Sequence, residues 1–326
     1  MPPFWWNRYG KLAPSGGGGG GGGLAGTSIS KDLIADQTWE RLSSDLLLSG
    51  NWAFDAVEGL GTLSSAATVG HILAHGEGND IRVTTEWTYV SGAANTSFGV
   101  IGRMPTYINP DDFYYWVRIY NESNLRLSTS NGGTANLDTV NLTWPIIPGN
   151  RFQLIHEITN STTTQDHVGT FKGEPWLDNN PGAATYNLSG IAAGADTDLT
   201  VIVDRGAPQV ITFTAGDFAN YAACTPAEVS AVMTASLVGA RTFLWGNIIF
   251  LASTGGYGAT YFIEAAAGPG NNANGVLGFD EVEYPGDLKT VSGSDATYNY
   301  GFIGFRSGFS GVTGQWLRYI EVEYLT

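Results

Sequence analysis

The sequence predicts a mainly β protein, an antiparallel jelly-roll sandwich with a small inserted α+β domain and an extended N-terminal arm. From about residue 31, short runs of alternating apolar and polar residues are broken by Gly, Asn and Asp clusters, a pattern typical of strands with one buried face. Between about residues 199 and 283 one stretch acquires helical spacing, and the strand pattern then returns. Glycine accounts for 45 of the 326 residues, about twice the usual share of roughly 7%, which agrees with a chain rich in turns.

The first 30 residues predict an anchor followed by a tether. Residues 1–15 hold four aromatic side chains and two basic ones but no acidic one. Because aromatic residues and arginine are the types that fill pockets of a partner, we expect this basic aromatic peptide to dock on a larger body; a disordered terminus is the alternative. The residues expected to make the contact are Phe4, Trp5, Trp6, Arg8 and Tyr9. Residues 16–30 begin with eight consecutive glycines, which predict a flexible tether.

The sandwich is expected to occupy residues 31–198 and 284–326. Its clearest strands are expected over 80–90, 97–103, 113–120, 124–129 and 150–158. Within 113–120, alternate side chains face opposite sides of the sheet. The set that suits the core is Phe113, Tyr115, Val117 and Ile119. The set expected on a half-exposed surface is Tyr114, Trp116, Arg118 and Tyr120.

Residues 199–283 predict an inserted ββαββ unit. Strands are expected over 200–203 and 209–214, and again over 242–251 and 259–264. Between them, Thr225 and Glu228 form a capping box around a proline at the first helical position. The apolar residues that follow at helical spacing are Val229, Val232, Met233 and Leu237. Gly239 is expected to end the helix.

The last part of the chain is expected to return to the sandwich. Residues 301–309 and 315–325 again alternate apolar and polar side chains, but they are too short to form a domain alone. We expect them to form a hairpin that completes the sandwich begun near residue 31. The α+β unit would then be an insertion.

Charge and composition exclude several classes of function. The chain has 15 Lys and Arg against 30 Asp and Glu, a net charge of −15, which argues against nucleic-acid binding. Cys224 is the single cysteine, so an intrachain disulfide and a cysteine-based zinc site are excluded. No apolar run is long enough to cross a membrane as a helix, and the N-terminus lacks the apolar region of a signal peptide. We therefore expect no membrane insertion and no export by a cleaved signal.

The acidic residues do not predict an enzyme. Glycoside hydrolysis requires two carboxylates that flank a sugar cleft. The nearest acidic phrases are DEVE at 280–283 and EVE at 321–323, and their alternation is typical of the exposed face of an edge strand. Glu281 and Glu321 are therefore predicted to be surface residues.

The histidines predict no metal centre, whereas the acidic residues of the expected loops leave a calcium site open. His71 and His75 are four residues apart but are bracketed by glycines, which does not favour a helical metal pair. His156 and His167 have no Ser or Cys partner at a recognisable spacing. Calcium stays open as a ligand, because acidic residues occur in expected loops. These residues are Asp111, Asp112, Asp138 and Asp196.

The stripe of Tyr114, Trp116, Arg118 and Tyr120 is the candidate glycan-binding surface. Aromatic rings present flat apolar faces with a polar edge, which suits stacking on pyranose rings. The alternative is that the second sheet, the insertion or a neighbouring subunit covers the stripe.

Two parts of the chain resemble known families. The phrases GVIGRM at 99–104, DDFYYWVRIYNESNLRLS at 111–128 and GNRFQLIHEI at 149–158, with GFR at 304–306 and IEV at 320–322, resemble the concanavalin A-like (laminin G-type) lectin/glucanase sandwich. The resemblance covers roughly 210 residues in two pieces and specifies the fold far better than the function. Hydrolases of this family carry the phrase Glu-x-Asp-x-x-Glu, which this sequence lacks.

The insertion is similar to a small module of bacteriophage structural proteins. The matching phrases are TFTAGDF at 212–218, TPAEV at 225–229 and NGVLGF at 274–279. This resemblance implies a virion component, such as a capsid decoration protein, a head fibre or a tail fibre.

These observations together predict a non-enzymatic virion structural protein at the virion surface. Its N-terminal peptide is expected to bind the major capsid protein or a tail or portal protein, and its lectin-like head to adhere to a host-surface glycan or to stabilise the shell. A homotrimer is expected by analogy with fibres and cement proteins. The alternatives are a tail fibre or adaptor that binds a receptor, and a free glycan-binding module.

Overall fold

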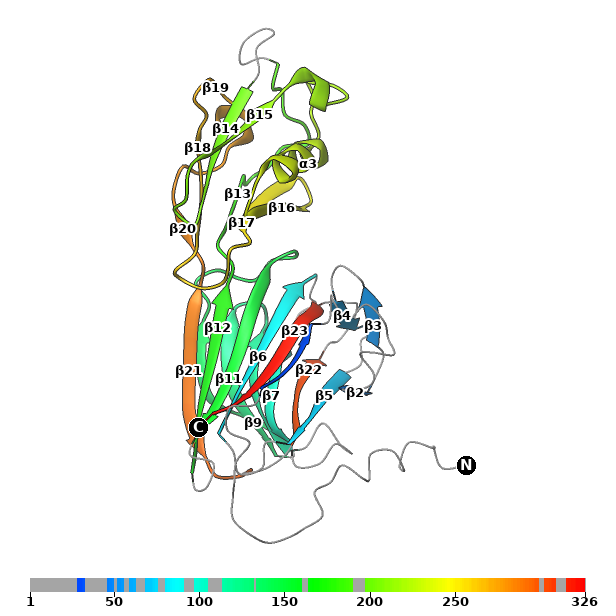
Figure 1. Cartoon of the computed structure of the whole chain (residues 1–326), viewed down its shortest axis with the longest axis vertical. Helices are drawn as coiled ribbons and strands as arrows, with labels where there is room; N and C mark the ends of the chain where they lie inside the picture. Colours follow the sequence, from blue (N-terminus) through cyan, green and yellow to red (C-terminus); the bar gives the residue numbers. More distant parts are fainter. Residues whose placement is uncertain are drawn as a thin grey trace, which may run out of the picture.

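The computed structural model describes residues 28–32, 46–49, 52–55, 59–62, 68–75, 80–90, 97–104, 113–131, 133–159, 164–189, 197–298, 302–308 and 315–325. These residues form a mainly β protein, and the predicted fold class is confirmed. Figure 1 shows a large sandwich with a smaller unit stacked on one end of it. The N-terminal peptide from Phe4 to Tyr9 and residues 16–27 of the tether lie outside the described residues, so both stay predictions. Residues 28–30, expected in the tether, instead belong to the first strand, β1 (Ser28–Asp32), which pairs with the C-terminal strand.

The sandwich consists of two sheets whose strands pair antiparallel. The eight-stranded sheet has the order β21 (Leu288–Asp295), β12 (Gln165–Gly173), β11 (Arg151–Thr159), β6 (Ile81–Tyr89), β23 (Gln315–Tyr324), β4 (Gly59–Thr62) and β3 (Trp52–Asp55), and β1 (Ser28–Asp32) also pairs with β23. The seven-stranded sheet has the order β10 (Thr134–Asn141), β9 (Asn124–Asn131), β8 (Phe113–Tyr120), β7 (Ser97–Met104), β22 (Phe302–Gly308), β5 (Thr68–His75) and β2 (Leu46–Ser49).

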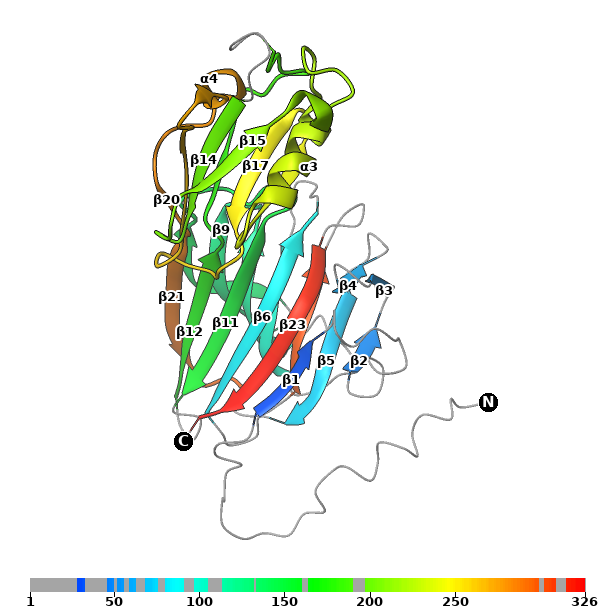
Figure 2. The same ribbon diagram turned by 45° about the horizontal axis from the view of Figure 1, so that its top comes forward.

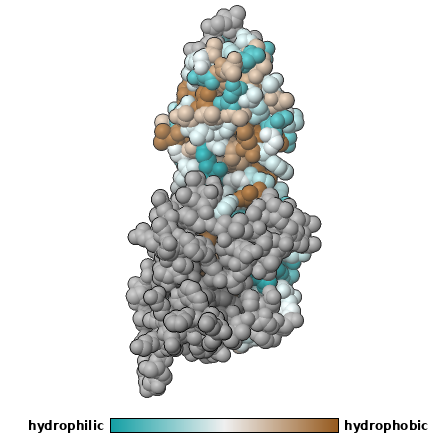
Figure 3. Space-filling model, turned by 90° about the vertical axis from the view of Figure 1, so that its right-hand side faces the viewer, coloured by the Kyte–Doolittle hydropathy of each residue, from teal (hydrophilic) through white to brown (hydrophobic). Residues whose placement is uncertain are grey.

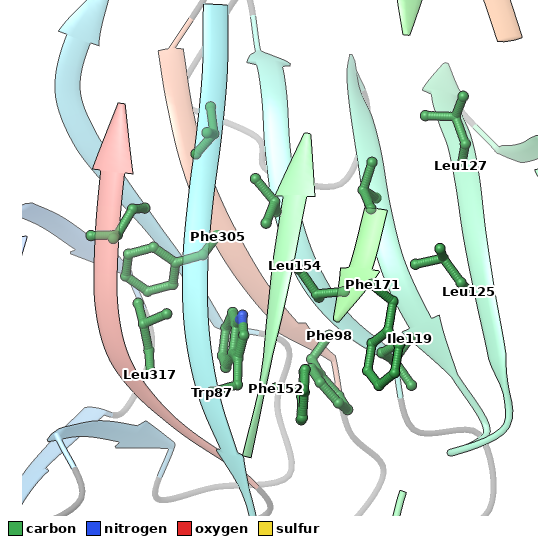
Figure 4. Close-up of a cluster of buried hydrophobic side chains, with 14 of the residues drawn as sticks. Trp87, Phe98, Ile119, Leu125, Leu127, Phe152, Leu154, Phe171, Phe305 and Leu317 are labelled. Atoms are coloured by element: carbon green, nitrogen blue, oxygen red, sulfur yellow. The ribbon is translucent and has the colours of Figure 1, made fainter. Parts of the chain in front are cut away.

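The core of the sandwich lies between these sheets. Alternate residues of each strand point inward, as the exposures along β11 show: inward side chains are buried and outward ones are half-buried. Trp87, Phe98, Phe152 and Phe305 meet at ring-centroid distances of 5.6–6.3 Å, as Figure 4 shows. Leucines and isoleucines fill the space around these rings.

The two C-terminal strands differ from the prediction. β22 pairs with β5 and β7 in the seven-stranded sheet, whereas β23 pairs with β1, β4 and β6 in the eight-stranded sheet. They therefore face each other across the core instead of forming a hairpin. A register shift in β23 lies between Leu317 and Tyr319. Because of this bulge both Leu317 and Ile320 point into the core, which explains the imperfect alternation of the sequence.

The insertion lies between β12 and β21, which are neighbours in the eight-stranded sheet. Its five-stranded sheet consists of β15 (Gln209–Phe213), β14 (Thr197–Val203), β18 (Phe262–Ala267) and β20 (Tyr284–Pro285), with β19 (Asn271–Asn272) beside β14. Its three-stranded sheet consists of β13 (Trp176–Asp178), β17 (Ile248–Ser253) and β16 (Ala240–Trp245). The helices are η1 (Ala215–Asp217), α3 (Pro226–Ser236) and α4 (Asn274–Leu277).

A second hydrophobic core fills the insertion, and Figure 2 shows α3 packed beside its strands. This core includes Leu177, Tyr186 and Leu188, which precede the 199–283 range expected from the sequence. They belong to it because β13 completes the three-stranded sheet through its pairing with β17.

The helix of the insertion begins as predicted. The Thr225 side chain accepts from the backbone N–H of Glu228, and the Glu228 carboxylate accepts from that of Thr225 at 2.8 Å. The helix ends at Ser236, three residues before Gly239. The predicted single strand 242–251 is two strands, β16 and β17, because Gly246 adopts a φ of +61° in the turn between them. None of the helices in the described part of the chain is long and apolar enough to cross a membrane.

Candidate functional site

A cleft of about 580 Å³ lies where the insertion meets the outer face of the eight-stranded sheet. Strands β6, β11 and β12 form its floor, and the loop 253–261 of the insertion forms its roof. Its volume lies in the range of small-molecule sites, roughly 300–1,000 Å³. Because the insertion between β12 and β21 supplies the roof, this cleft depends on the insertion, and we name it the junction cleft.

The floor carries a row of polar side chains from three neighbouring strands. Gln153 of β11 lies directly opposite Glu86 of β6 on one side and opposite Lys172 of β12 on the other. All three are half-buried and line the cleft. They occupy the outward positions of strands whose inward positions fill the core. An acid, an amide and an amine thus stand side by side.

Backbone hydrogen bonds hold the roof in place. The N–H of Gly258 donates to the carbonyl of Gly173, the last residue of the floor strand β12, at 2.8 Å. Within the insertion, the N–H of Gly286 donates to the carbonyl of Tyr261 at 3.0 Å. A Cβ on Gly256 would lie 2.1 Å from the Tyr261 ring, so glycine is required where that ring packs against the loop. The tyrosine rings of the roof, Tyr257 and Tyr261, are thereby held over the polar row.

Glu174 is a buried carboxylate at one end of the cleft. Its Oε1 lies 2.6 Å from Nη2 of Arg241 and accepts the backbone N–H of Arg151 at 2.7 Å. Burial raises the pKa of Glu174, and the charge of Arg241 acts in the opposite direction. Since Arg241 belongs to β16, this ion pair also links the insertion to the sandwich.

Glu86 is likewise held by neighbours. Its Oε1 lies 3.3 Å from Nε of Arg318, and the hydroxyl of Tyr257 forms a hydrogen bond with it. Burial raises the pKa of Tyr257 above its usual range, and the charge of Glu86 adds to this effect. Tyr257 therefore stays a neutral donor at any ordinary pH.

The cleft is suited to a ligand rich in hydroxyl groups. Carboxylates accept hydrogen bonds, ammonium and guanidinium groups donate them, and an amide does both. Two acids, Glu86 and Glu174, oppose two cations, Arg151 and Lys172, so the lining has no excess of charge. Tyrosine rings add apolar area with a polar edge.

The predicted glycan-binding stripe on β8 is not the open surface that the sequence suggested. Tyr114 is 1% exposed, Trp116 is 3% exposed and Arg118 is 7% exposed; only Tyr120 is half-buried. The Tyr114 and Trp116 rings meet edge to face at 5.8 Å and form a small apolar cluster with Ile101. Alternation predicted their shared face correctly, but the half-exposed surface expected there is wrong.

The acids and histidines considered in the sequence lie in other places. Glu283 forms an ion pair with Arg205 at 2.8 Å, and Glu281 accepts from the amide of Asn274 at 3.2 Å. His156 and His167 are buried between the two sheets. Within the described ranges, no three His, Cys, Asp or Glu side chains are grouped as metal ligands.

The predicted calcium ligands are only partly described. Both carboxylate oxygens of Asp138 accept backbone N–H groups, from Thr139 at 2.7 Å and from Ser292 at 2.9 Å. The other three, Asp111, Asp112 and Asp196, lie outside the described residues.

Sequence reasoning missed the residues of the cleft. Glu86, Gln153 and Lys172 come from three strands, and only the inter-strand register places them in one row. The usable signal was the polar residue at an outward position of each strand.

No family model matches the sequence, and no curated protein matches it. Among solved structures, the carbohydrate-binding module CBM66 from Bacillus subtilis is similar with a TM-score of 0.37 at 10% identity, over 86% of this chain and 95% of that one. Peanut lectin with a nine-residue peptide is similar with a TM-score of 0.38 at 8% identity, over 91% of this chain and 96% of that one. Lectin UEA-II complexed with galactose is similar with a TM-score of 0.33 at 9% identity, over 87% of this chain and 99% of that one. At these values the likeness concerns the sandwich shape alone.

Proposed function

We propose that this chain is a non-catalytic carbohydrate-binding protein whose ligand occupies the junction cleft. The observation that supports this most is the row of Glu86, Gln153 and Lys172 beneath the tyrosines of the roof. Alternating donors and acceptors match the vicinal hydroxyls of a saccharide. The balanced charge of the lining favours a neutral ligand over a nucleotide or another polyanion.

The state of the two carboxylates supports binding without catalysis. A hydrolase needs one carboxyl group that carries a proton and one that is free to act as base or nucleophile. Glu174 is paired with Arg241, and Glu86 is held by Arg318 and Tyr257. Both are therefore occupied in holding the cleft together.

The test is a glycan array followed by titration calorimetry with the best neutral oligosaccharide. Lys172→Met and Gln153→Met should each weaken binding about tenfold, the usual effect of losing a hydrogen bond to a charged or buried partner. Lys289→Met is the matched control, because Lys289 lies on the next strand and its Nζ is 3.6 Å from Asp287. Equal affinities of all three variants and the wild type would contradict binding in the cleft, and release of reducing ends would contradict the absence of catalysis.

We further propose that this binding head belongs to a virion structural protein, a capsid decoration protein or head fibre, displayed at the virion surface. The aromatic peptide before the octaglycine segment and the phage-like phrases of the insertion support this role. Large apolar side chains are exposed on the insertion, among them Val238 at 79% and Trp245 at 53%, and Figure 3 shows apolar patches there between polar ones. Such surfaces favour contacts with other subunits, in keeping with a trimer.

Immunogold labelling of particles with an antibody against residues 31–326 tests this role. Gold over the shell supports a decoration protein or head fibre, and gold at one vertex supports a tail fibre or adaptor. The double variant Trp5→Ala, Trp6→Ala should abolish incorporation while the head still unfolds at the wild-type temperature. Unchanged incorporation would contradict the proposed role of the N-terminal peptide as an anchor. Wild-type particles without gold would favour the alternative function, a free glycan-binding module.

A further inference from the structure

Three arginines align across the outer face of the seven-stranded sheet. Arg126 of β9 lies directly opposite Arg118 of β8, Arg118 lies opposite Gly99 of β7, and Gly99 lies opposite Arg306 of β22. Because Gly99 has no side chain, the guanidinium groups of Arg118 and Arg306 approach the same region. Like charges directly opposite each other destabilise a sheet, so this row needs a physical reason.

Aromatic rings separate the guanidinium groups of this arginine row. The Tyr120 ring lies 3.7 Å from the guanidinium carbon of Arg126 and 5.3 Å from that of Arg118. The Trp116 ring lies 4.7 Å from Arg118 and 5.2 Å from Arg306. These cation–π contacts hold the side chains in place but do not neutralise their charge. They also occupy the ring faces on which a sugar would stack.

Four other arginines among the described residues lie beside carboxylates. The pairs, at 2.6–3.3 Å, are Arg82 with Glu157 and Glu323, Arg205 with Glu283, Arg241 with Glu174, and Arg318 with Glu86. In contrast, within the described part of the chain Arg118 donates to neutral oxygens, Oγ of Ser97 at 3.1 Å and Oδ1 of Asn136 at 3.4 Å. Among the described residues, neither Arg118 nor Arg126 has a carboxylate in contact.

Several N–H groups of this cluster are buried and have no acceptor among the described residues. They are Nε of Arg118, Nε of Arg126 and Nε1 of Trp116. Burial and then the charge of Arg126 lower the pKa of Arg118 to about 10. A buried charge without a counter-ion is costly, and unpaired buried donors add to that cost. A negatively charged acceptor between these groups would remove both costs.

We propose that Arg118, Arg126 and the Trp116 indole bind an oxyanion, a carboxylate, sulfate or phosphate group. Guanidinium groups form paired hydrogen bonds with such groups, and charge-assisted bonds are about twice as strong as neutral ones. The entrance lies at the β9–β10 edge of the sheet, where Tyr120 and Arg126 are half-buried and Asn136 is exposed. This site is on the opposite sheet from the junction cleft and does not depend on it.

The test compares thermal unfolding in sodium sulfate, phosphate and acetate with unfolding in sodium chloride at equal ionic strength, and measures sulfate affinity by titration calorimetry. Sulfate should raise the melting temperature of the wild type in a saturable manner. Arg126→Gln, at the half-buried end of the row, should fold and weaken sulfate binding tenfold or more. Arg118→Lys keeps a charge but loses the planar fork, and should also weaken binding.

Arg205→Gln is the matched control, because Arg205 also stacks on an aromatic ring, Phe262 at 3.6 Å, but has Glu283 as its counter-ion. It should leave sulfate binding unchanged, as should Lys172→Met in the junction cleft. The ranking of sulfate, phosphate and acetate identifies the oxyanion. Equal sulfate affinity of Arg126→Gln and the wild type would overturn the proposal. So would a wild type that no oxyanion stabilises, the result expected if a carboxylate of the same chain occupies the site.

Discussion

A pair of buried histidines makes the stability of the sandwich core depend on pH. Nε2 of His156 lies 3.1 Å from Nδ1 of His167 between the two sheets. One of these nitrogens donates and the other accepts, so the contact accommodates only one proton. Burial, followed by the charge of Arg103, lowers the pKa of His167 to about 4. Burial, followed by the charge of His167, lowers the pKa of His156 well below 6.5.

This pair predicts a loss of stability in mild acid. Both histidines titrate near 6.5 when unfolded and lower when folded, so the unfolded state binds more protons below that pH. The free energy of unfolding should fall as the pH drops from 6.5 towards 4, by about 1.4 kcal/mol per pH unit for each histidine that stays neutral. Urea unfolding at pH 7.5, 6 and 5 measures the slope. In the double variant His156→Gln, His167→Gln the free energy of unfolding should depend less steeply on pH. Equal slopes in the variant and the wild type would show that this pair does not cause the pH dependence.

Gly99 provides a second prediction at the scale of one residue. A Cβ there would lie 2.0 Å from the carbonyl oxygen of Val117 and 2.9 Å from Nε1 of Trp116. Because the clash involves backbone of the neighbouring strand, Gly99→Ala should lower the free energy of unfolding by about 3 kcal/mol. Gly133→Ala is the control, since no atom of the described residues lies within 4 Å of its added Cβ. Denaturant midpoints of the two variants should differ clearly; similar midpoints would show that β7 and β8 adjust.

Among the elements, helix α3 depends on the capping box at its N-terminus. Thr225 Oγ1 accepts from the Glu228 N–H, a donor that no residue within the helix satisfies. Thr225→Ala should destabilise the insertion by about 1 kcal/mol, whereas Thr225→Ser keeps the hydroxyl and should be nearly neutral. Chemical denaturation, monitored by a spectroscopic probe within the insertion, measures the free energy of unfolding of both variants. A loss in Thr225→Ser as large as in Thr225→Ala would mean that the methyl group, not the cap, matters.

Local sequence determines where the strands lie, but not which of their side chains are exposed. The strands expected over 80–90, 97–103, 113–120 and 150–158 coincide with β6, β7, β8 and β11 to within a residue or two, because alternation is a local property. Exposure is not local: Trp116 occupies the predicted face but is 3% exposed. The junction cleft was unpredictable for the same reason, since the inter-strand register places Glu86 and Lys172 on either side of Gln153 and a loop of the insertion encloses them.

At the scale of the whole molecule, two hydrophobic cores meet through a polar junction. The core of the sandwich and that of the insertion share no residue. Contacts between the two units include the ion pair of Arg241 with Glu174 and the backbone bond from Gly258 to Gly173. The insertion therefore adds a binding cleft to the sandwich without entering its core.

This arrangement predicts that the sandwich folds without the insertion. β12 and β21 are antiparallel neighbours, Lys172 lies opposite Leu288, and the N–H of Gly173 donates to the carbonyl of Asp287 at 2.9 Å. Replacing residues 174–286 by Asn-Gly would close these strands as a two-residue hairpin with a turn that suits their twist. The shortened chain should keep one cooperative thermal transition, because its core is intact.

Ligand binding by the shortened chain separates the two proposed sites. It should lose oligosaccharide binding, because the roof with Tyr257 and Tyr261 is removed, and should keep sulfate stabilisation, because Arg118 and Arg126 lie on the other sheet. Calorimetry with both ligands on the same sample measures this. A shortened chain that unfolds without a cooperative transition would mean that the insertion supports the sandwich as well as the cleft. Retained oligosaccharide binding would move the glycan site from the cleft to the sandwich itself.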